Sequence, residues 1–157
     1  DFETQWIESF NLGTSSRNTL GPTVTDPASF TELVEEGADT FDFETTSDRF
    51  GTTRFVGSDY LTGNDIVIDG VTLLGTAFEV TAFAPDGTED FRVEGQEFIV
   101  PEWRTFMSGI RTISSENGET ERNNTPVDFA FPGEAGFLAV NPIYDCSVVL
   151  SSLEVTQ

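Results

Sequence analysis

Apolar and polar residues alternate along most of this chain, and Gly, Pro, Asn and Asp interrupt the alternation at intervals. Residues 40–44, Thr-Phe-Asp-Phe-Glu, are the clearest case. A period of two residues is typical of antiparallel strands with one buried face and one solvated face. We therefore expect an all-β protein in which Phe41 and Phe43 point into the core and Asp42 points to solvent.

The same alternation predicts a series of further short strands. They span residues 6–10, 53–56, 65–68, 71–74, 77–83, 91–93, 98–100, 106–113, 127–131, 136–140 and 147–155. Asp69-Gly70 between two apolar runs indicates a two-residue hairpin of type I′. Two more turns are predicted at Pro85-Asp86-Gly87 and at Asn117-Gly118. The stretch 13–25 is polar and rich in Ser, Thr and Asn, which favours a loop or a flexible tether.

One segment follows a helical period instead. After Asp26 and Pro27, the apolar residues Phe30, Leu33 and Val34 recur at helical spacing, and a glycine follows at position 37. We expect a short helix near residues 27–36 that caps one end of the β structure. Many short, evenly spaced strands favour an antiparallel, jelly-roll-like β-sandwich over an up-and-down barrel.

The length of 157 residues is that of one domain, and we expect a single β-sandwich domain over residues 1–157. Fifteen of the residues are Phe, so core volume should come from a few bulky rings. No apolar run approaches the roughly 18 residues of a membrane helix, so membrane insertion is not expected. A chain that begins at Asp1 is interpreted as a mature, exported product or as an excised domain.

The charge is strongly one-sided. Twenty-eight acidic residues face seven basic residues, all arginine, and there is no lysine or histidine, which leaves a formal charge of -21. Such a charge argues against a nucleic-acid partner. Without histidine and lysine, most nucleophilic and metal-hydrolytic sites are excluded. A two-carboxylate glycosidase remains formally possible, with Glu102 beside Trp103 as its acid, but we expect no enzyme activity.

Clustered acids predict calcium sites instead, because calcium takes six to eight oxygen ligands from carboxylates and carbonyls. The first candidate is the turn that carries Asp86, Glu89 and Asp90. The second candidate is an acidic stretch within ten residues, which consists of Asp39, Asp42, Glu44 and Asp48. Neither cluster matches the EF-hand pattern, and a solvated acidic face is the alternative for each.

Two further groups are candidate contact residues. Trp103 with Arg104, and also Tyr60, could stack against sugar rings and bind them through hydrogen bonds, although packing at the rim of the core is the alternative. At the N-terminus, the apolar residues that need burial are Trp6, Ile7 and Phe10. Residues 1–24 would then be an N-terminal strand plus a flexible segment, and the strand could complete the sheet of a neighbouring subunit.

Two functions remain open. The first is a non-catalytic structural or adhesive protein, secreted or on the cell surface, which self-assembles into a filament, sheath or surface layer with calcium-assisted contacts between subunits. The second is a carbohydrate-binding module of a secreted protein, which would bind polysaccharide through Trp103 or Tyr60.

Overall fold

The computed structural model describes residues 1–140, and these residues form an antiparallel β structure with one short α-helix. In chain order the elements are β1 (Glu8–Asn11), β2 (Ser16–Asp26), α1 (Phe30–Glu36), β3 (Ala38–Ser47), β4 (Gly51–Leu61), β5 (Ile66–Ile68), β6 (Val71–Phe83), β7 (Glu89–Val100), the 3₁₀ turn η1 (Pro101–Trp103), β8 (Thr105–Ser115) and β9 (Gly118–Asn123).

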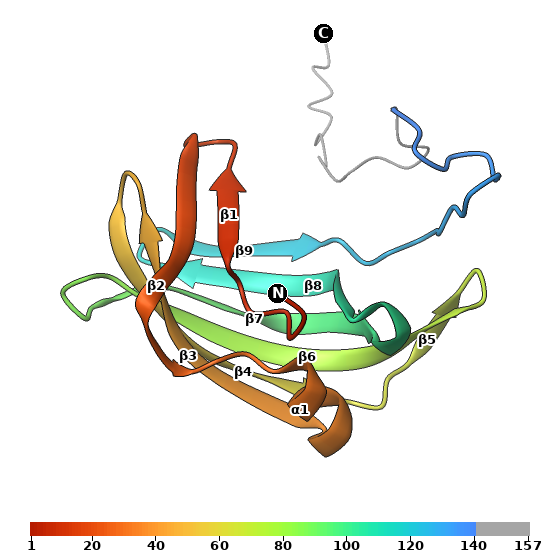
Figure 1. The fold of residues 1–157 in the computed structure, drawn as a ribbon, viewed down its shortest axis with the longest axis horizontal. Coiled ribbons are helices and arrows are strands. Elements are labelled where there is room, and N and C mark those ends of the chain that lie inside the picture. Colours follow the sequence, from red (N-terminus) through yellow and green to blue (C-terminus); the bar gives the residue numbers. More distant parts are fainter. Residues whose placement is uncertain (141–157) are drawn as a thin grey trace, which may run out of the picture.

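The strands form one sheet in the order β1-β2-β3-β4-β6-β7-β8-β9, and β5 pairs with β6 beside this path. Every pairing is antiparallel. The sheet curls into a half-barrel, and the β1–β2 hairpin rises over its concave side (Figure 1). The all-β prediction is confirmed. The jelly-roll-like sandwich is not confirmed, because long twisted strands coil into one curved sheet instead of dividing into two stacked sheets.

The stretch 13–25 is not the predicted flexible tether, because most of it belongs to β2, which pairs with both β1 and β3. Its sequence is polar because most of the strand is solvent-exposed. The register shifts between Leu20 and Val24 and again before Asp26. Gly21 and Pro22 lie at the first shift, where an irregular ladder tolerates a proline without an amide hydrogen. Figure 1 shows that β2 curves along its length and that the β1–β2 hairpin rises over the sheet.

The other strand predictions are partly confirmed and partly wrong. Four of the short predicted strands are joined in pairs into β6 and β7, and β9 was not predicted because all six of its residues are exposed. Residues 127–131 and 136–140 are not strands, although their apolar residues suggested them. The predicted strand 147–155 lies outside the described residues.

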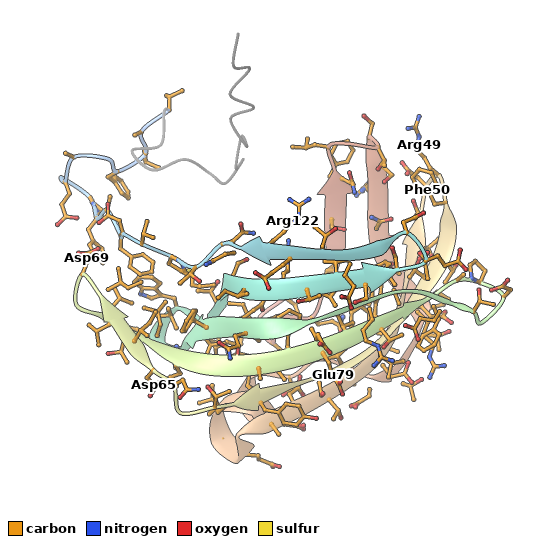
Figure 2. The ribbon with its side chains drawn as sticks, turned by 180° about the vertical axis from the view of Figure 1, so that it is seen from behind. Arg49, Phe50, Asp65, Asp69, Glu79 and Arg122 are labelled. Atoms are coloured by element: carbon orange, nitrogen blue, oxygen red, sulfur yellow. The ribbon has the colours of Figure 1, made fainter. Side chains whose placement is uncertain are left out.

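Local turn chemistry is confirmed. Ile68 pairs with Val71, and both intervening residues have positive φ, 49° at Asp69 and 82° at Gly70, as a type I′ turn requires. Asp69 marks the tip of this hairpin in Figure 2. At the second predicted turn, Gly87 N donates to Ala84 O at 2.9 Å.

Helix α1 packs on one end of the curled sheet, as predicted. Its N-cap is Ser29, whose side chain accepts a hydrogen bond from Glu32 N, and Gly37 ends it at a φ of 84°. Phe30 and Leu33 are buried and form one cluster with Ile99, against which three half-buried residues pack. Within residues 1–140, neither α1 nor the 3₁₀ turn has the length and apolar character that a bilayer-spanning helix needs.

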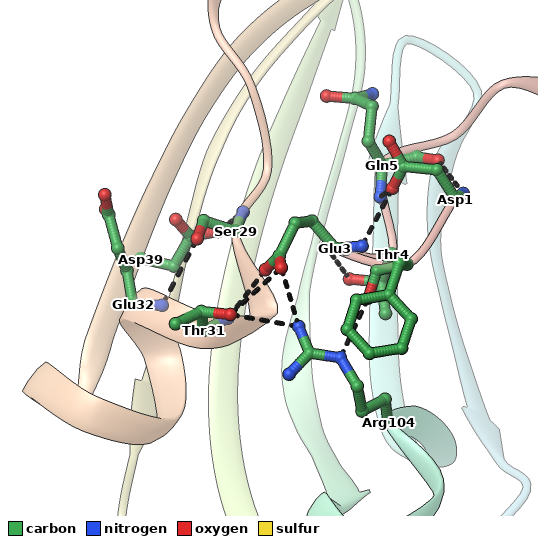
Figure 3. Close-up of polar contacts among 10 residues, drawn as sticks. Asp1, Glu3, Thr4, Gln5, Ser29, Thr31, Glu32, Asp39 and Arg104 are labelled. Atoms are coloured by element: carbon green, nitrogen blue, oxygen red, sulfur yellow. Dashed lines mark hydrogen bonds and ion pairs between the residues drawn. The ribbon is translucent and has the colours of Figure 1, made fainter.

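The first residues of the chain are held inside the half-barrel by polar contacts (Figure 3). Glu3 accepts hydrogen bonds from both Thr31 N and Thr31 Oγ1, at 2.9 and 3.0 Å, and forms an ion pair with Arg104 at 2.9 Å. Gln5 is buried, and its Oε1 accepts from Ala28 N at 3.0 Å. The N-terminal segment is therefore bound to α1 and to Arg104, the residue that follows η1, in its own chain.

Candidate functional site

The concave side of the half-barrel contains a cavity of about 480 Å³. This volume lies within the range of small-molecule binding sites, roughly 300–1,000 Å³. Most of the lining is apolar, and eight aromatic residues contribute to it: Trp6, Phe30, Phe41, Phe43, Phe55, Phe78, Phe91 and Phe106. Trp6 packs edge-on against Phe43 and Phe55, with ring centroids 5.8 and 5.4 Å apart. The N-terminal segment thus supplies part of the cavity wall.

Strand pairing sorts the inward side chains into rows across the sheet. Phe43 lies opposite Phe55, which lies opposite Ala82, and Phe91 follows on β7. In the next row Phe41 lies opposite Gly57. A Cβ at Gly57 would come within 2.5 Å of the Phe41 ring, so glycine makes room for that ring on the sheet. Two neighbouring rows are therefore apolar.

The third row is polar. Asp39 lies opposite Asp59, which lies opposite Phe78, and Gly95 and Arg111 complete the row on β7 and β8. Directly opposed residues of antiparallel strands have Cβ atoms roughly 4.5–5.5 Å apart, so the two aspartates are close neighbours. A fourth charged residue, Glu97, also lines the cavity, two residues beyond Gly95 on β7.

The three carboxyl groups that line the cavity are hard to ionise. Burial, followed by the nearby charges of Glu97 and Asp39, raises the pKa of Asp59 to about 7. Burial also raises the pKa of Asp39 to about 6, although a hydrogen bond from Ser29 N opposes the shift. Burial raises the pKa of Glu97, against the opposing charge of Arg111. Perturbed acids in an apolar cleft are a general mark of functional sites.

Two residues that line the cavity, Asp39 and Arg111, each have a buried polar atom without a hydrogen-bond partner. Asp39 is 5% exposed; its Oδ2 accepts from Ser29 N at 3.0 Å, whereas its buried Oδ1 accepts no hydrogen bond. Arg111 Nε is buried and also unpartnered. Unsatisfied buried groups destabilise a protein by about 1–3 kcal/mol each, so such groups require a reason. A ligand that hydrogen-bonds to them would remove this cost.

The arrangement can do three things chemically. Its aromatic rows can take up an apolar body, and the ionised carboxylates can hold a cation or hydrogen-bond donors. A neutral Asp59 can also donate a hydrogen bond or a proton, since its pKa lies close to neutral pH. All of these capacities lie in one cavity.

The predicted calcium ligands are not gathered around one point in the described part of the chain. Asp39 faces the cavity, whereas Asp42 and Glu44, at alternate positions, face the outer side of β3. Asp42 forms a two-bond ion pair with Arg54, at 2.6 and 2.7 Å. Asp48 accepts a hydrogen bond from the Arg17 backbone.

The acids of the other predicted cluster also have local roles. Asp86 Oδ1 accepts from both Thr88 N and Thr88 Oγ1, which closes the turn. Glu89 pairs with Arg92 at 3.7 Å, and Asp90 is exposed. Among residues 1–140, no group of three or more acidic or cysteine side chains is arranged to hold a metal ion. The calcium site stays a prediction.

The residues predicted to bind sugar do not form one site. Trp103 is 41% exposed and packs edge-on against Phe129 and Phe131. The guanidinium of Arg104 is occupied by Glu3, by Phe2 O and by Thr31. Tyr60 is 45% exposed and lines a shallow hollow on the opposite face of the sheet from the cavity.

The predicted assembly residues have different positions. Trp6 packs into the cavity wall. Ile7 is half exposed, and its carbonyl oxygen accepts from Leu20 N at 2.8 Å. Phe10 lies on β1, opposite Arg17 of β2, and is 59% exposed. In this structure β1 therefore pairs with the same chain.

Asp59, Glu97 and Arg111 were not identified from the sequence. A usable signal exists, because Asp39 and Asp59 occupy the inward phase of strands whose other inward residues include Phe41, Phe43 and Phe55. A charged residue on the apolar phase of a strand indicates a buried charge with a specific role. Comparison of the chain with protein-family models, with curated proteins and with solved structures finds no match.

Proposed function

We propose that this chain is a non-catalytic, extracellular binding protein that holds a small, largely apolar ligand in its concave cavity. The observation that carries the proposal is a cavity of about 480 Å³ with aromatic walls, which Asp39 also lines with a carboxyl group whose buried Oδ1 has no hydrogen-bond partner. The absence of histidine and lysine supports a role in binding over catalysis. A polysaccharide is disfavoured, because phenylalanine rings dominate the lining.

The neutral fluorophore N-phenyl-1-naphthylamine tests this proposal, since its emission rises in apolar cavities. We expect saturable binding by the unmodified chain. Val93 lines the cavity, so Val93→Trp should fill it and weaken binding at least tenfold. The control Val67→Trp adds the same bulk to β5, where Val67 is 66% exposed, and should leave binding unchanged. Equal binding by both variants, or none by the unmodified chain, would contradict the proposal.

Self-assembly is the second candidate, and the open edges of the sheet favour it. β1 and β9 end the strand order, and all of their residues are exposed. Unpaired edge strands are templates for another chain. Calcium would act between subunits, where acids of two chains meet, because the acids within residues 1–140 do not converge on one ion. In this proposal neighbouring subunits pair β1 with β9.

Electron microscopy after calcium addition tests this second proposal. We expect filaments or sheets with calcium, and none with sodium at the same ionic strength, because sodium only screens the charge. Phe10→Ser removes an exposed ring from the edge strand β1 and should reduce assembly. Phe50→Ser removes a 66% exposed ring from the β3–β4 turn and should not (Figure 2). Particles that form equally in sodium would exclude a specific role of calcium.

A further inference from the structure

The lining of the cavity contains more acidic residues than basic residues. Three acids line it, Asp39, Asp59 and Glu97, and Arg111 is the one basic residue among the lining side chains of residues 1–140. Arg111 acts electrostatically on Glu97. Asp39 and Asp59 have no such compensation, because the charges that act on them are acidic: Glu32 and Asp26 act on Asp39, and Glu97 and Asp39 act on Asp59. The cavity therefore has a local excess of negative charge.

Asp39 gives the clearest evidence that the site lacks a hydrogen-bond donor. The residue is 95% buried and lines the cavity; its Oδ2 accepts a hydrogen bond from Ser29 N, and its buried Oδ1 has no partner. A buried carboxylate is retained when it is paired or hydrogen-bonded. The amide of Thr40, the next residue of β3, lowers the pKa of the Asp39 carboxyl, but no donor within residues 1–140 lies in hydrogen-bond geometry with Oδ1. A donor from within the cavity would supply this hydrogen bond.

The rest of the wall determines what can carry that donor. Beyond the polar row lie the two apolar rows, which contain Phe41, Phe43, Phe55 and Phe91. These rings bury an apolar body, and aromatic faces also attract a cation. The cavity wall is thus polar and acidic along one row and apolar along the next two rows. An amphipathic molecule with a cationic end matches this order.

We propose that the ligand carries a protonated amine on an apolar or aromatic body, with the ammonium group at Asp39 and Asp59 and the body along Phe43, Phe55 and Phe91. This inference rests on the proposed function, because it specifies the chemistry of the same cavity. The ammonium group pairs with the carboxylates of Asp39 and Asp59 and balances the excess negative charge. Arg111 on β8 and Glu97 on β7 lie toward the other end of the polar row from Asp39.

Displacement of bound N-phenyl-1-naphthylamine by three matched eight-carbon probes tests the ligand class. The probes are octylamine, octanol and octanoate, compared at about pH 8 and at constant ionic strength. We expect octylamine to displace the fluorophore at a concentration at least tenfold lower than octanol, and octanoate to be the weakest. Asp39→Asn and Asp59→Asn should each reduce the advantage of octylamine at least threefold and leave octanol unaffected.

The control Asp90→Asn removes one negative charge from an exposed position and should preserve the advantage of octylamine, which separates the site from general attraction to an acidic protein. If octylamine and octanol displace equally, or if Asp90→Asn acts like Asp59→Asn, the amine inference is overturned while the binding function stands. If the fluorophore does not bind to the unmodified chain, both are overturned.

Discussion

Replacement of Phe43 by alanine is expected to lower the free energy of unfolding by about 3–5 kcal/mol, the range for truncation of a buried phenylalanine. Phe43 is 2% exposed, and its ring contacts Trp6, Phe41 and Phe55 at centroid distances of 5.7–5.8 Å. The loss should be large because the ring joins the N-terminal segment to β3 and β4. A cavity in its place would loosen all three elements.

Chemical denaturation, followed by circular dichroism, measures this loss. Asp42→Ala is the control, since Asp42 is the next residue of β3 and points outward to Arg54. Removal of that partly exposed ion pair should lower the free energy of unfolding by less than about 1 kcal/mol. Phe41→Ala should have an intermediate effect, because its ring borders the cavity and is only half buried. A greater loss from Asp42→Ala than from Phe43→Ala would show that the assigned facing of β3 is wrong.

Stability is expected to fall as the pH rises from about 4 to about 7, and Asp59 is a principal cause. Its pKa is about 7 in the folded chain, against an ordinary value of 3.8. The folded state therefore binds this proton more tightly than the unfolded state, and its stabilising effect is lost as the pH passes through the folded pKa. A shift of roughly three units corresponds to at most about 4 kcal/mol. Partial solvent exposure should reduce this to roughly 1–3 kcal/mol.

Asp59→Asn isolates this effect from the general repulsion of an acidic chain. The variant should be more stable than the unmodified chain by roughly 1–3 kcal/mol at about pH 8, and the difference should vanish near pH 4. Thermal unfolding across this pH range provides the measurement. Asp90→Asn, at an exposed position, should show little of this pH dependence. A difference that is equal at both pH values, or that is larger near pH 4, would contradict the burial of an ionisable Asp59.

Features that depend on a few neighbouring residues were predictable. The Asp69-Gly70 hairpin follows from the positive φ of both residues. The helix follows from its apolar spacing and from Gly37 at its end. The predicted start at residue 27 is three residues too early, because α1 begins at Phe30 with Ser29 as its N-cap. Ser29 is the residue whose hydroxyl reaches a free amide of the first turn.

Features that depend on partners far along the chain were not predictable. β2 and β9 carry few buried side chains, so they lack alternation and exist because a neighbouring strand offers a ladder of hydrogen bonds. Apolar residues in 127–131 imitate a strand, yet Phe129 and Phe131 pack on Trp103 instead. An apolar pattern indicates that a side chain needs burial, but it does not indicate which surface buries that side chain.

The sequence alone determined the antiparallel β class, the positions of its turns and helix, and the facing of Phe41 and Phe43, because these follow from side-chain alternation and backbone preferences within a few residues. The tertiary structure alone decided that the strands form one curled sheet and that Asp39, Asp59, Glu97 and Arg111 share a cavity. The reason is physical: successive strand pairings place Asp39 in one row with Arg111, which lies 72 positions further along the chain (111 − 39), and Trp6 packs on Phe43 and Phe55 from outside the sheet order. Local sequence preferences contain no information on which strands pair or on where Trp6 packs.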